Sequence, residues 1–142
     1  MQTFSKAMGL AAARIGMAFA ATDILTYFFR MKPPYNISTI NQEAALERLR
    51  EIRPITVQTD TITAERKRLA EKLATIPVVE KVWPSDSNFL LVQVKNPDSV
   101  YNKLIDSSII VRNKSREVDG CLRITAGTRS ENDRLINELN KL

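Results

Sequence analysis

Residues 88–107, "NFLLVQVKNPDSVYNKLIDS", change from one type of local structure to another and thereby indicate the class of fold. The first seven residues are mostly apolar, with the composition of a short β-strand. Asn96 then suits a helix N-cap, and Pro97 suits the first helical position, where its missing N–H costs nothing. A strand followed directly by a helix indicates a mixed α and β structure.

Further strands and a last helix surround this stretch. Three other short runs read as strands: "EKVWP" at 80–84, "SIIVR" at 108–112 and "CLRITA" at 121–126. Thr128 and Glu131 have capping-box spacing and predict the start of a final helix. Its apolar stripe is Leu135, Leu139 and Leu142. Residues 57–142 are therefore expected to form an α+β domain, with helices on one face of a small sheet.

Upstream of this domain the sequence predicts a strand and three helices. The strand covers 13–20, and a short helix covers 23–32 before two prolines. A second helix runs from Thr39, which has capping-box spacing with Gln42, to about Pro54. The third helix covers 57–76, with its apolar face made of Ile62, Leu69, Leu73 and Ile76. We expect residues 1–56 to be organised separately from 57–142.

Composition narrows the possible functions. The 142 residues are 44% hydrophobic and lack any apolar run long enough for a membrane span, which favours a soluble protein. A single cysteine, Cys121, suits the cytoplasm, and the lack of histidine argues against a triad hydrolase or a zinc enzyme. The net charge of +5 raises nucleic acid as a partner, but the basic residues are scattered among acids, which favours a solvated surface.

Two cations near the start of the chain call for an explanation, since "TFSKAMGLAAARIG" at 3–16 is otherwise small and apolar. Lysine becomes a covalent catalyst when its amine loses its proton, and a nearby fixed cation favours that loss. Arg14 could supply that cation to Lys6, or could bind an anion beside it. With the hydroxyls of Thr3 and Ser5, the pattern describes a phosphate cradle next to a Schiff-base lysine.

Two further arginines are candidates for binding an anion. Arg123 lies in the middle of the strand at 121–126, on the face that alternation gives to Cys121 and Thr125. Arg112 ends the run at 108–112. On adjacent strands the two guanidiniums would form a fork for a carboxylate or phosphate, although each alone is also compatible with an ordinary surface position.

Five motifs in order give the chain a resemblance to a known family. The stretch 3–16 resembles the lysine motif of fold type I aminotransferases that use pyridoxal phosphate. The other four are "KPPYNIST" at 32–39, "WPSDSNFLLV" at 83–92, "IIVRN" at 109–113 and "GCLRITAGT" at 120–128. Together they are similar to the histidinol-phosphate aminotransferase family, which acts in histidine biosynthesis. The resemblance covers nearly the whole chain.

The resemblance implies roles for individual residues. Lys6 would bond covalently to pyridoxal phosphate and then move the α-proton of the substrate. The cofactor phosphate would be held by Thr3, Ser5 and Arg14. Arg112 and Arg123 would bind the anionic end of histidinol phosphate or of glutamate and 2-oxoglutarate. Asn113 departs from the family, which usually has Asp there, so Arg112 lacks its nearest acidic neighbour. The family also implies a homodimer, and neither a metal nor a membrane.

The same resemblance concerns only part of an enzyme. Five residues precede Lys6, whereas family members carry most of a large α/β domain before that lysine. We therefore expect the last piece of the large domain at 1–56 and the α+β C-terminal small domain at 57–142. The chain alone is expected to be inactive and to self-associate. The alternatives are an enzyme like phosphothreonine decarboxylase, a stand-alone α+β module that binds an anion and, third, a basic nucleic-acid binder.

Overall fold

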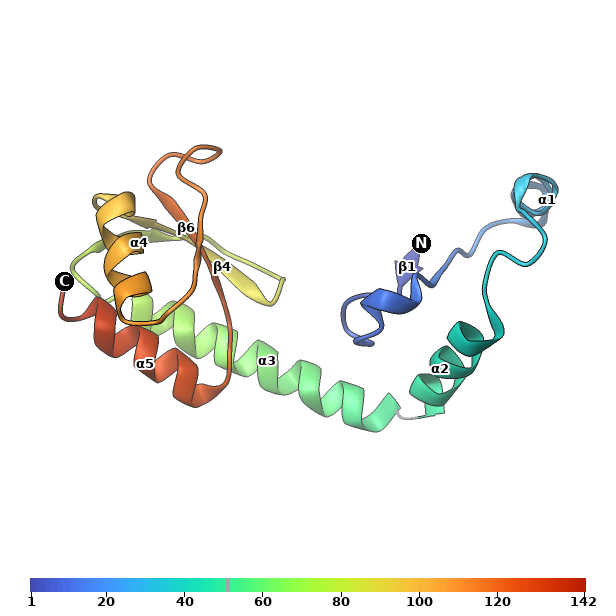
Figure 1. Ribbon diagram of the computed structural model, residues 1–142, viewed down its shortest axis with the longest axis horizontal. Helices are drawn as coiled ribbons and strands as arrows, with labels where there is room; N and C mark the ends of the chain where they lie inside the picture. Colours follow the sequence, from blue (N-terminus) through green and yellow to red (C-terminus); the bar gives the residue numbers. More distant parts are fainter. Residues whose placement is uncertain (51) are drawn as a thin grey trace. The chain divides into compact units, whose positions relative to one another are not determined.

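A computed structural model describes residues 1–50 and 52–142, which form two compact units, 1–59 and 60–142 (Figure 1). The helices are α1 (Thr22–Met31), α2 (Thr39–Arg50), α3 (Ile52–Leu73), α4 (Pro97–Asp106), α5 (Arg129–Leu139) and the short 3-10 helix η1 (Ala11–Ala13). The strands are β1 (Gln2–Thr3), β2 (Gly16–Met17), β3 (Val79–Val82), β4 (Phe89–Val94), β5 (Arg112–Asn113) and β6 (Cys121–Thr125). Within the described residues, no helix is both long and apolar enough to cross a membrane.

The second unit is built on a four-stranded antiparallel sheet in the order β3-β4-β6-β5. Leu90, Val92 and Val94 are buried while the alternating residues of β4 are half-buried, so the sheet has an inner and an outer face. Side chains from α3, α4 and α5 complete the core on the inner face: Leu69, Leu73, Val100, Leu104, Leu135 and Leu139. The predicted α+β class and one-sided packing of helices are confirmed.

The prediction of a strand at 108–112 was largely wrong. The observed β5 contains only Arg112 and Asn113, and Ser108 adopts a left-handed conformation with φ of 58°. The N–H of Ile109 donates to the carbonyl of Leu104, which ties this segment to the end of α4 instead of to the sheet. Its apolar character reflects partial burial against the core, which a strand pattern does not distinguish from pairing.

Helix starts follow the sequence with two differences. Thr128 and Glu131 form the predicted capping box at α5. Asn96 occupies the N-cap position of α4, but it is left-handed, with φ of 51°, and its side chain does not bond to the helix. At α2 the Ser38 hydroxyl, rather than that of Thr39, accepts a hydrogen bond from a backbone N–H in the first turn. Leu142 lies beyond α5 and is exposed, contrary to the predicted stripe.

Helix α3 begins earlier than predicted and contains Pro54, which was expected to separate two helices. The position is tolerated because first-turn N–H groups have no partner inside the helix, so proline removes no hydrogen bond there. Of the predicted apolar face, Leu69 and Leu73 are fully buried, whereas Ile62 is 40% exposed. Ile76 is buried but follows the helix in a turn.

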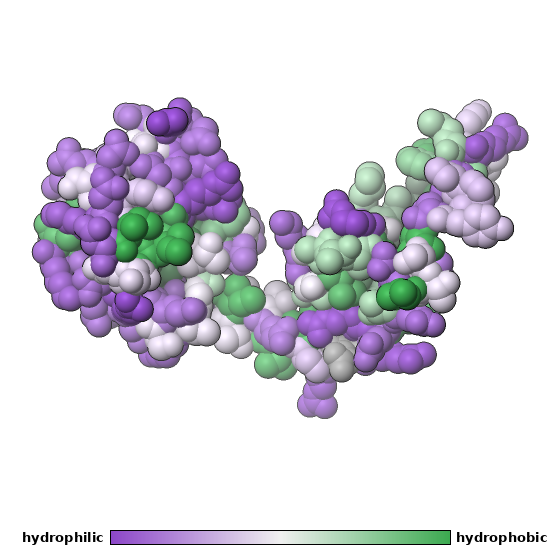
Figure 2. All heavy atoms as spheres, viewed as in Figure 1, coloured by the Kyte–Doolittle hydropathy of each residue, from purple (hydrophilic) through white to green (hydrophobic). Residues whose placement is uncertain are grey.

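The first unit has a much smaller core. Its buried cluster consists of Phe4, Ala13, Ile15 and Ala45. Antiparallel pairing of β1 with β2 is limited to two residues on each strand, so the predicted strand at 13–20 is reduced to Gly16–Met17. Helix α1 lies within one residue of its prediction but buries none of its side chains. Figure 2 shows pale green among purple over this helix. Its exposed large hydrophobic residues are Ile24, Tyr27, Phe28, Phe29 and Met31.

Candidate functional site

The lysine segment forms a closed loop between β1 and β2. The N–H of Phe4 donates to the carbonyl of Ile15 at 3.1 Å, and the carbonyl of Phe4 accepts from the N–H of Leu10 at 2.9 Å. Burial of the Phe4 ring fixes the base of the loop. Lys6 is exposed in this loop, and its carbonyl accepts from the N–H of Gly9, whose φ of 70° suits glycine. The loop therefore presents the lysine amine to solvent from a defined backbone.

Two of the predicted phosphate ligands lie together. The hydroxyl of Thr3 donates to the hydroxyl oxygen of Ser5 at 3.0 Å and accepts from the Ser5 N–H at 3.1 Å. Arg14 closes the same loop in a left-handed conformation, with φ of 53°, and its guanidinium donates to the carbonyl of Ala11 at 3.1 Å. Within the described residues neither Arg14 nor Lys6 bonds to these hydroxyls. The four predicted residues share one loop, but only two of them touch.

The predicted arginine pair lies across two neighbouring strands. Arg112 of β5 is the direct partner of Arg123 in β6, so both side chains point to the same face of the sheet. Arg112 is exposed, while Arg123 is half-buried. The Nε atom of Arg123 is buried and has no hydrogen-bond partner, and its guanidinium lies 5.0 Å from the centre of the Phe89 ring. Like charges opposite each other destabilise a sheet, so this pair is suited to a bound anion.

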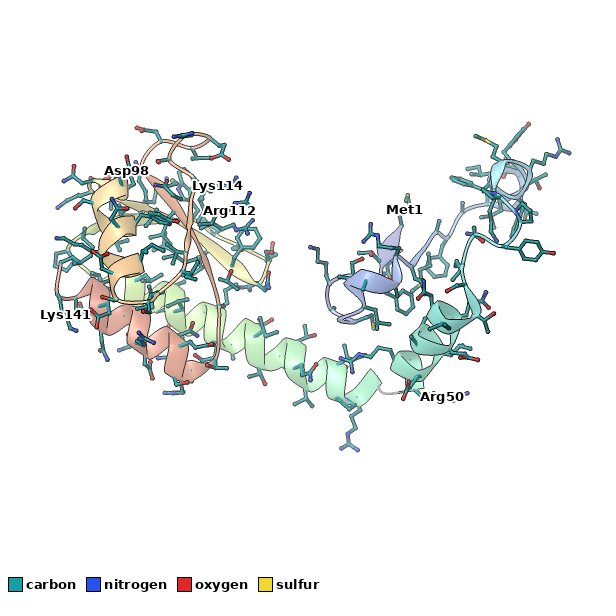
Figure 3. The ribbon with its side chains drawn as sticks, in the orientation of Figure 1. Met1, Arg50, Asp98, Arg112, Lys114 and Lys141 are labelled. Atoms are coloured by element: carbon teal, nitrogen blue, oxygen red, sulfur yellow. The ribbon has the colours of Figure 1, made fainter. Side chains whose placement is uncertain are left out.

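The acidic groups near the pair are engaged elsewhere. Lys114 donates to the Glu117 carboxylate at 2.6 Å, and this hydrogen bond is the main reason that the pKa of Glu117 lies below its usual value. Arg112 adds a smaller electrostatic contribution. Asn113 donates to Asp98 at 2.7 Å and accepts from the N–H and hydroxyl of Ser115. Figure 3 labels Arg112, Lys114 and Asp98 in this unit.

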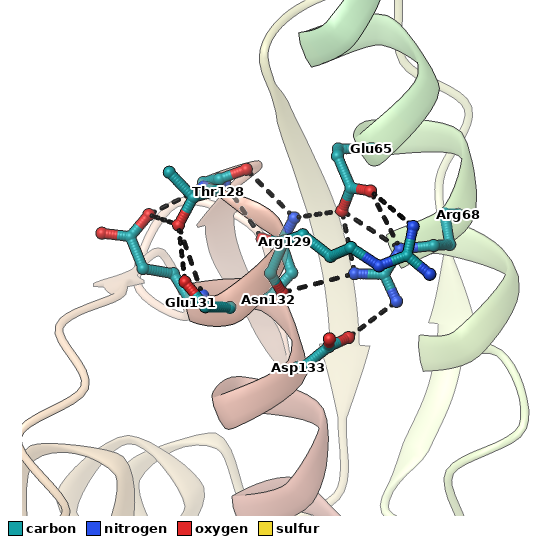
Figure 4. A network of polar contacts seen from close by, with 9 residues as sticks. Glu65, Arg68, Thr128, Arg129, Glu131, Asn132 and Asp133 are labelled. Carbon is teal, nitrogen blue, oxygen red and sulfur yellow. Dashed lines mark hydrogen bonds and ion pairs between the residues drawn. The ribbon is translucent and has the colours of Figure 1, made fainter.

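A network that the sequence did not reveal braces the end of β6. The Asn132 side chain is 2% exposed, accepts from the Gly127 N–H at 3.0 Å and donates to the Gly127 carbonyl at 3.1 Å (Figure 4). It also donates to Glu65, which accepts from Arg68 at 2.8 Å. Arg68 reaches Asp133 at 2.7 Å. Hydrogen bonds from Arg68 first, and then from Asn132, hold the pKa of Glu65 below its usual value.

The second unit also has a cleft that is not lined by Arg112 or Arg123. Its volume is about 370 Å³, and it lies between residues 108–111, the end of β6 and the first turns of α5. Arg112 and Arg123 are absent from its lining. They lie on the outer face of the sheet, opposite the core residues Leu122 and Ile124. The chemistry of the arginine pair therefore points to that face rather than to the cleft.

Comparison with solved structures defines the class of protein. The structure of histidinol-phosphate aminotransferase from Sinorhizobium meliloti, in complex with pyridoxal 5'-phosphate, matches with a TM-score of 0.77 and 27% sequence identity. The match covers 98% of this chain and 39% of that one. The fold is therefore that of the C-terminal portion of a fold type I transferase, an α/β class in which this chain supplies mainly the α+β small domain.

The family follows from sequence comparison. Residues 1–139 match the family "Aminotransferase class I and II", and the chain belongs to it. It is 44% identical over 144 residues to the histidinol-phosphate aminotransferase of Parabacteroides distasonis, and 42% identical over 143 residues to that of Flavobacterium psychrophilum. These alignments cover 100% and 99% of this chain. The chain spans 42% and 41% of the length of those relatives.

Proposed function

We propose that this chain is the C-terminal part of a histidinol-phosphate aminotransferase, which exchanges an amino group between histidinol phosphate and 2-oxoglutarate. The proposal rests chiefly on the cross-strand pair of Arg112 and Arg123, neither of which forms an ion pair within the described part of the chain, and on the 42–44% identity of the chain to enzymes of that name. We further propose that residues 1–56 belong to the cofactor-binding domain and 57–142 to the small domain. The protein is proposed to act in the cytoplasm as a homodimer.

The residues of the lysine loop fit pyridoxal phosphate as a cofactor. A phosphate group accepts several hydrogen bonds, and the hydroxyls of Thr3 and Ser5 lie 3.0 Å apart, so that both could donate to one acceptor if the Thr3 hydroxyl turned from Ser5 toward it. Arg14 provides positive charge from the same loop. When bound, the cofactor supplies an electron sink for the charge left at the α-carbon of the substrate. Thr3, Ser5 and Arg14 would hold its phosphate.

Lys6 is proposed as the catalytic residue. Its exposed side chain lies three residues beyond Thr3, in a loop whose backbone is fixed at Phe4. The amine would hold the cofactor covalently. Once the substrate has released it, the amine would take the proton from the substrate α-carbon and return it to the cofactor carbon that carried the aldehyde. A primary amine can perform both roles because it is a nucleophile and a base.

Arg112 and Arg123 are proposed to bind the anionic end of each substrate. Histidinol phosphate carries a phosphate, and glutamate carries a distal carboxylate, so one cationic site can serve both halves of the reaction. The planar guanidinium donates two parallel hydrogen bonds to such groups and thereby sets their orientation. The two arginines would thus hold the far end of the substrate and restrict its orientation.

A chimera tests the proposal. The residues that precede the lysine motif in the Parabacteroides distasonis relative are joined to this chain, and transamination between histidinol phosphate and 2-oxoglutarate is measured. We expect activity that Lys6→Ala abolishes and that Lys67→Ala, an exposed change on α3, preserves. The 142-residue chain alone is expected to be inactive. Release of carbon dioxide from O-phosphothreonine without transamination would instead support the decarboxylase alternative, and activity that survives Lys6→Ala would contradict the role of Lys6.

A further inference from the structure

We propose that Phe89 is a positioning residue for Arg123, holding its guanidinium on the outer face of the sheet ready for the substrate anion. This inference rests on the proposed function and adds a positioning residue to it. The ring centre of Phe89 lies 5.0 Å from the guanidinium carbon of Arg123. Cations within about 6 Å of an aromatic face are attracted by the electron density of the ring.

The register of the sheet explains the contact. Phe89 pairs with Thr125, and Leu91 pairs with Arg123, so Phe89 and Arg123 are diagonal neighbours on one face. At that spacing a long side chain and an aromatic ring can touch. The Nε of Arg123 has no hydrogen-bond partner among the described residues, and the Phe89 ring is a contact that can hold the guanidinium.

The backbone that carries the ring is itself braced. The Ser85 hydroxyl donates to the carbonyl of Phe89 at 2.6 Å and accepts from the N–H of Ser87 at 3.1 Å. The carbonyl of Asn88 accepts from the N–H of Ala126 at 2.9 Å, at the far end of β6. These bonds fix the turn before β4, so the ring is held in place against the strand that carries the arginine.

The Phe89 ring is needed to hold Arg123 because Arg112 lies directly opposite Arg123 in the sheet. Two guanidiniums on paired residues repel each other, and a free Arg123 side chain would turn away from its neighbour. Attraction to the ring opposes that movement. The Arg123 side chain therefore loses less conformational freedom when an anion binds. A leucine at position 89 would keep the apolar contact but lose the attraction to a cation, whereas a tyrosine would keep both.

The experiment is nuclear magnetic resonance of the arginine Nε–H groups in the ¹⁵N-labelled 142-residue chain. In the wild type we expect the Arg123 signal to be displaced by the ring current, and to move when inorganic phosphate or glutarate is added. Phe89→Leu should abolish the displacement of the Arg123 signal. It should also raise the dissociation constants of phosphate and glutarate by about three- to tenfold, the range expected for a partly exposed cation–π pair. Phe89→Tyr should preserve both properties. Phe28→Leu, in exposed helix α1, is the matched control and should change neither.

The outcomes separate this inference from the proposed function. An anion response that Phe89→Leu leaves unchanged would overturn the positioning role alone. A displacement and anion affinity that Phe89→Leu reduces, while Phe89→Tyr restores them, would support it. If the wild-type Arg123 signal responds to neither phosphate nor glutarate, the anion site of the proposed function is contradicted, and the role of Phe89 in binding is overturned with it.

Discussion

At the scale of single residues, Arg123 stands out because its buried Nε–H has no acceptor among the residues that the structure describes. In the active chimera we expect Arg123→Lys to raise KM for both substrates about tenfold or more, since a charge-assisted hydrogen bond contributes about 1.5 to 3 kcal/mol. The compact ammonium keeps the charge but cannot form the planar fork. Steady-state kinetics provide the measurement, with Arg116→Lys in the exposed loop as control. Unchanged KM values would reduce Arg123 to a structural residue.

Glu65 makes stability depend on pH in a defined direction. Its pKa is lowered in the folded protein, so the contribution of the carboxylate to stability is present above the ordinary Glu pKa and is lost as the pH falls through the folded value. Glu65→Gln should therefore lower the melting temperature of the second unit at pH 7, and its difference from the wild-type melting temperature should narrow as the pH falls below the ordinary range of a Glu carboxyl. Glu71→Gln, exposed on the same helix, should show no such trend. A gap that is constant with pH would contradict the assignment.

At the scale of elements, the start of α5 is held by the reciprocal bonds of Thr128 and Glu131. Thr128→Ala removes the side-chain acceptor for the Glu131 N–H, and should lower the free energy of unfolding by about 0.5 to 2 kcal/mol. Thr63→Ala, on the exposed surface of α3, is the matched control and should change it by less than about 0.5 kcal/mol. Chemical denaturation of the second unit gives both values, and equal effects would mean that the cap does not stabilise the helix.

The elements also show what a sequence can and cannot reveal. Strand β4 and helix α5 were predictable because a short apolar run of β-type residues and a capping box are local patterns. Residues 108–111 were misassigned because burial beside a sheet and pairing within it select the same apolar side chains. The fork of Arg112 and Arg123 was expected for adjacent strands, and the structure pairs the two residues across β5 and β6. The contact of Asn132 with Glu65 joins residues 67 positions apart and has no local signature.

At the scale of the whole molecule, the two units differ in how much core they bury. The second unit has 13 buried residues in one cluster, whereas the first has four. We expect amide hydrogen exchange to be slow in β4, β6 and α5, and faster by orders of magnitude in residues 1–31, since local stability follows buried apolar contact. Mass spectrometry after pulse labelling gives the comparison. Equal protection of both units would show that the first is stabilised by something beyond its own core.

Self-association is the second expectation at this scale. Helix α1 exposes three aromatic side chains and buries none of its residues, and exposed apolar surface of this kind favours association. Sedimentation of the 142-residue chain should give an average mass that rises with concentration. The double change Phe28→Glu and Phe29→Glu should reduce this rise, while Thr26→Glu on the same helix should not. A monomer at every concentration would contradict the expectation.

The bond between Asn113 and Asp98 constrains how the protein can evolve. The amide of Asn113 donates to the Asp98 carboxylate at 2.7 Å. An aspartate at position 113 would set two carboxylates against each other, and such pairs repel unless one takes up a proton. Asn113→Asp should therefore cost stability unless position 98 changes as well. In a mutational lineage these two sites should change together, and Asn113→Asp should be tolerated in a background that already carries Asp98→Asn.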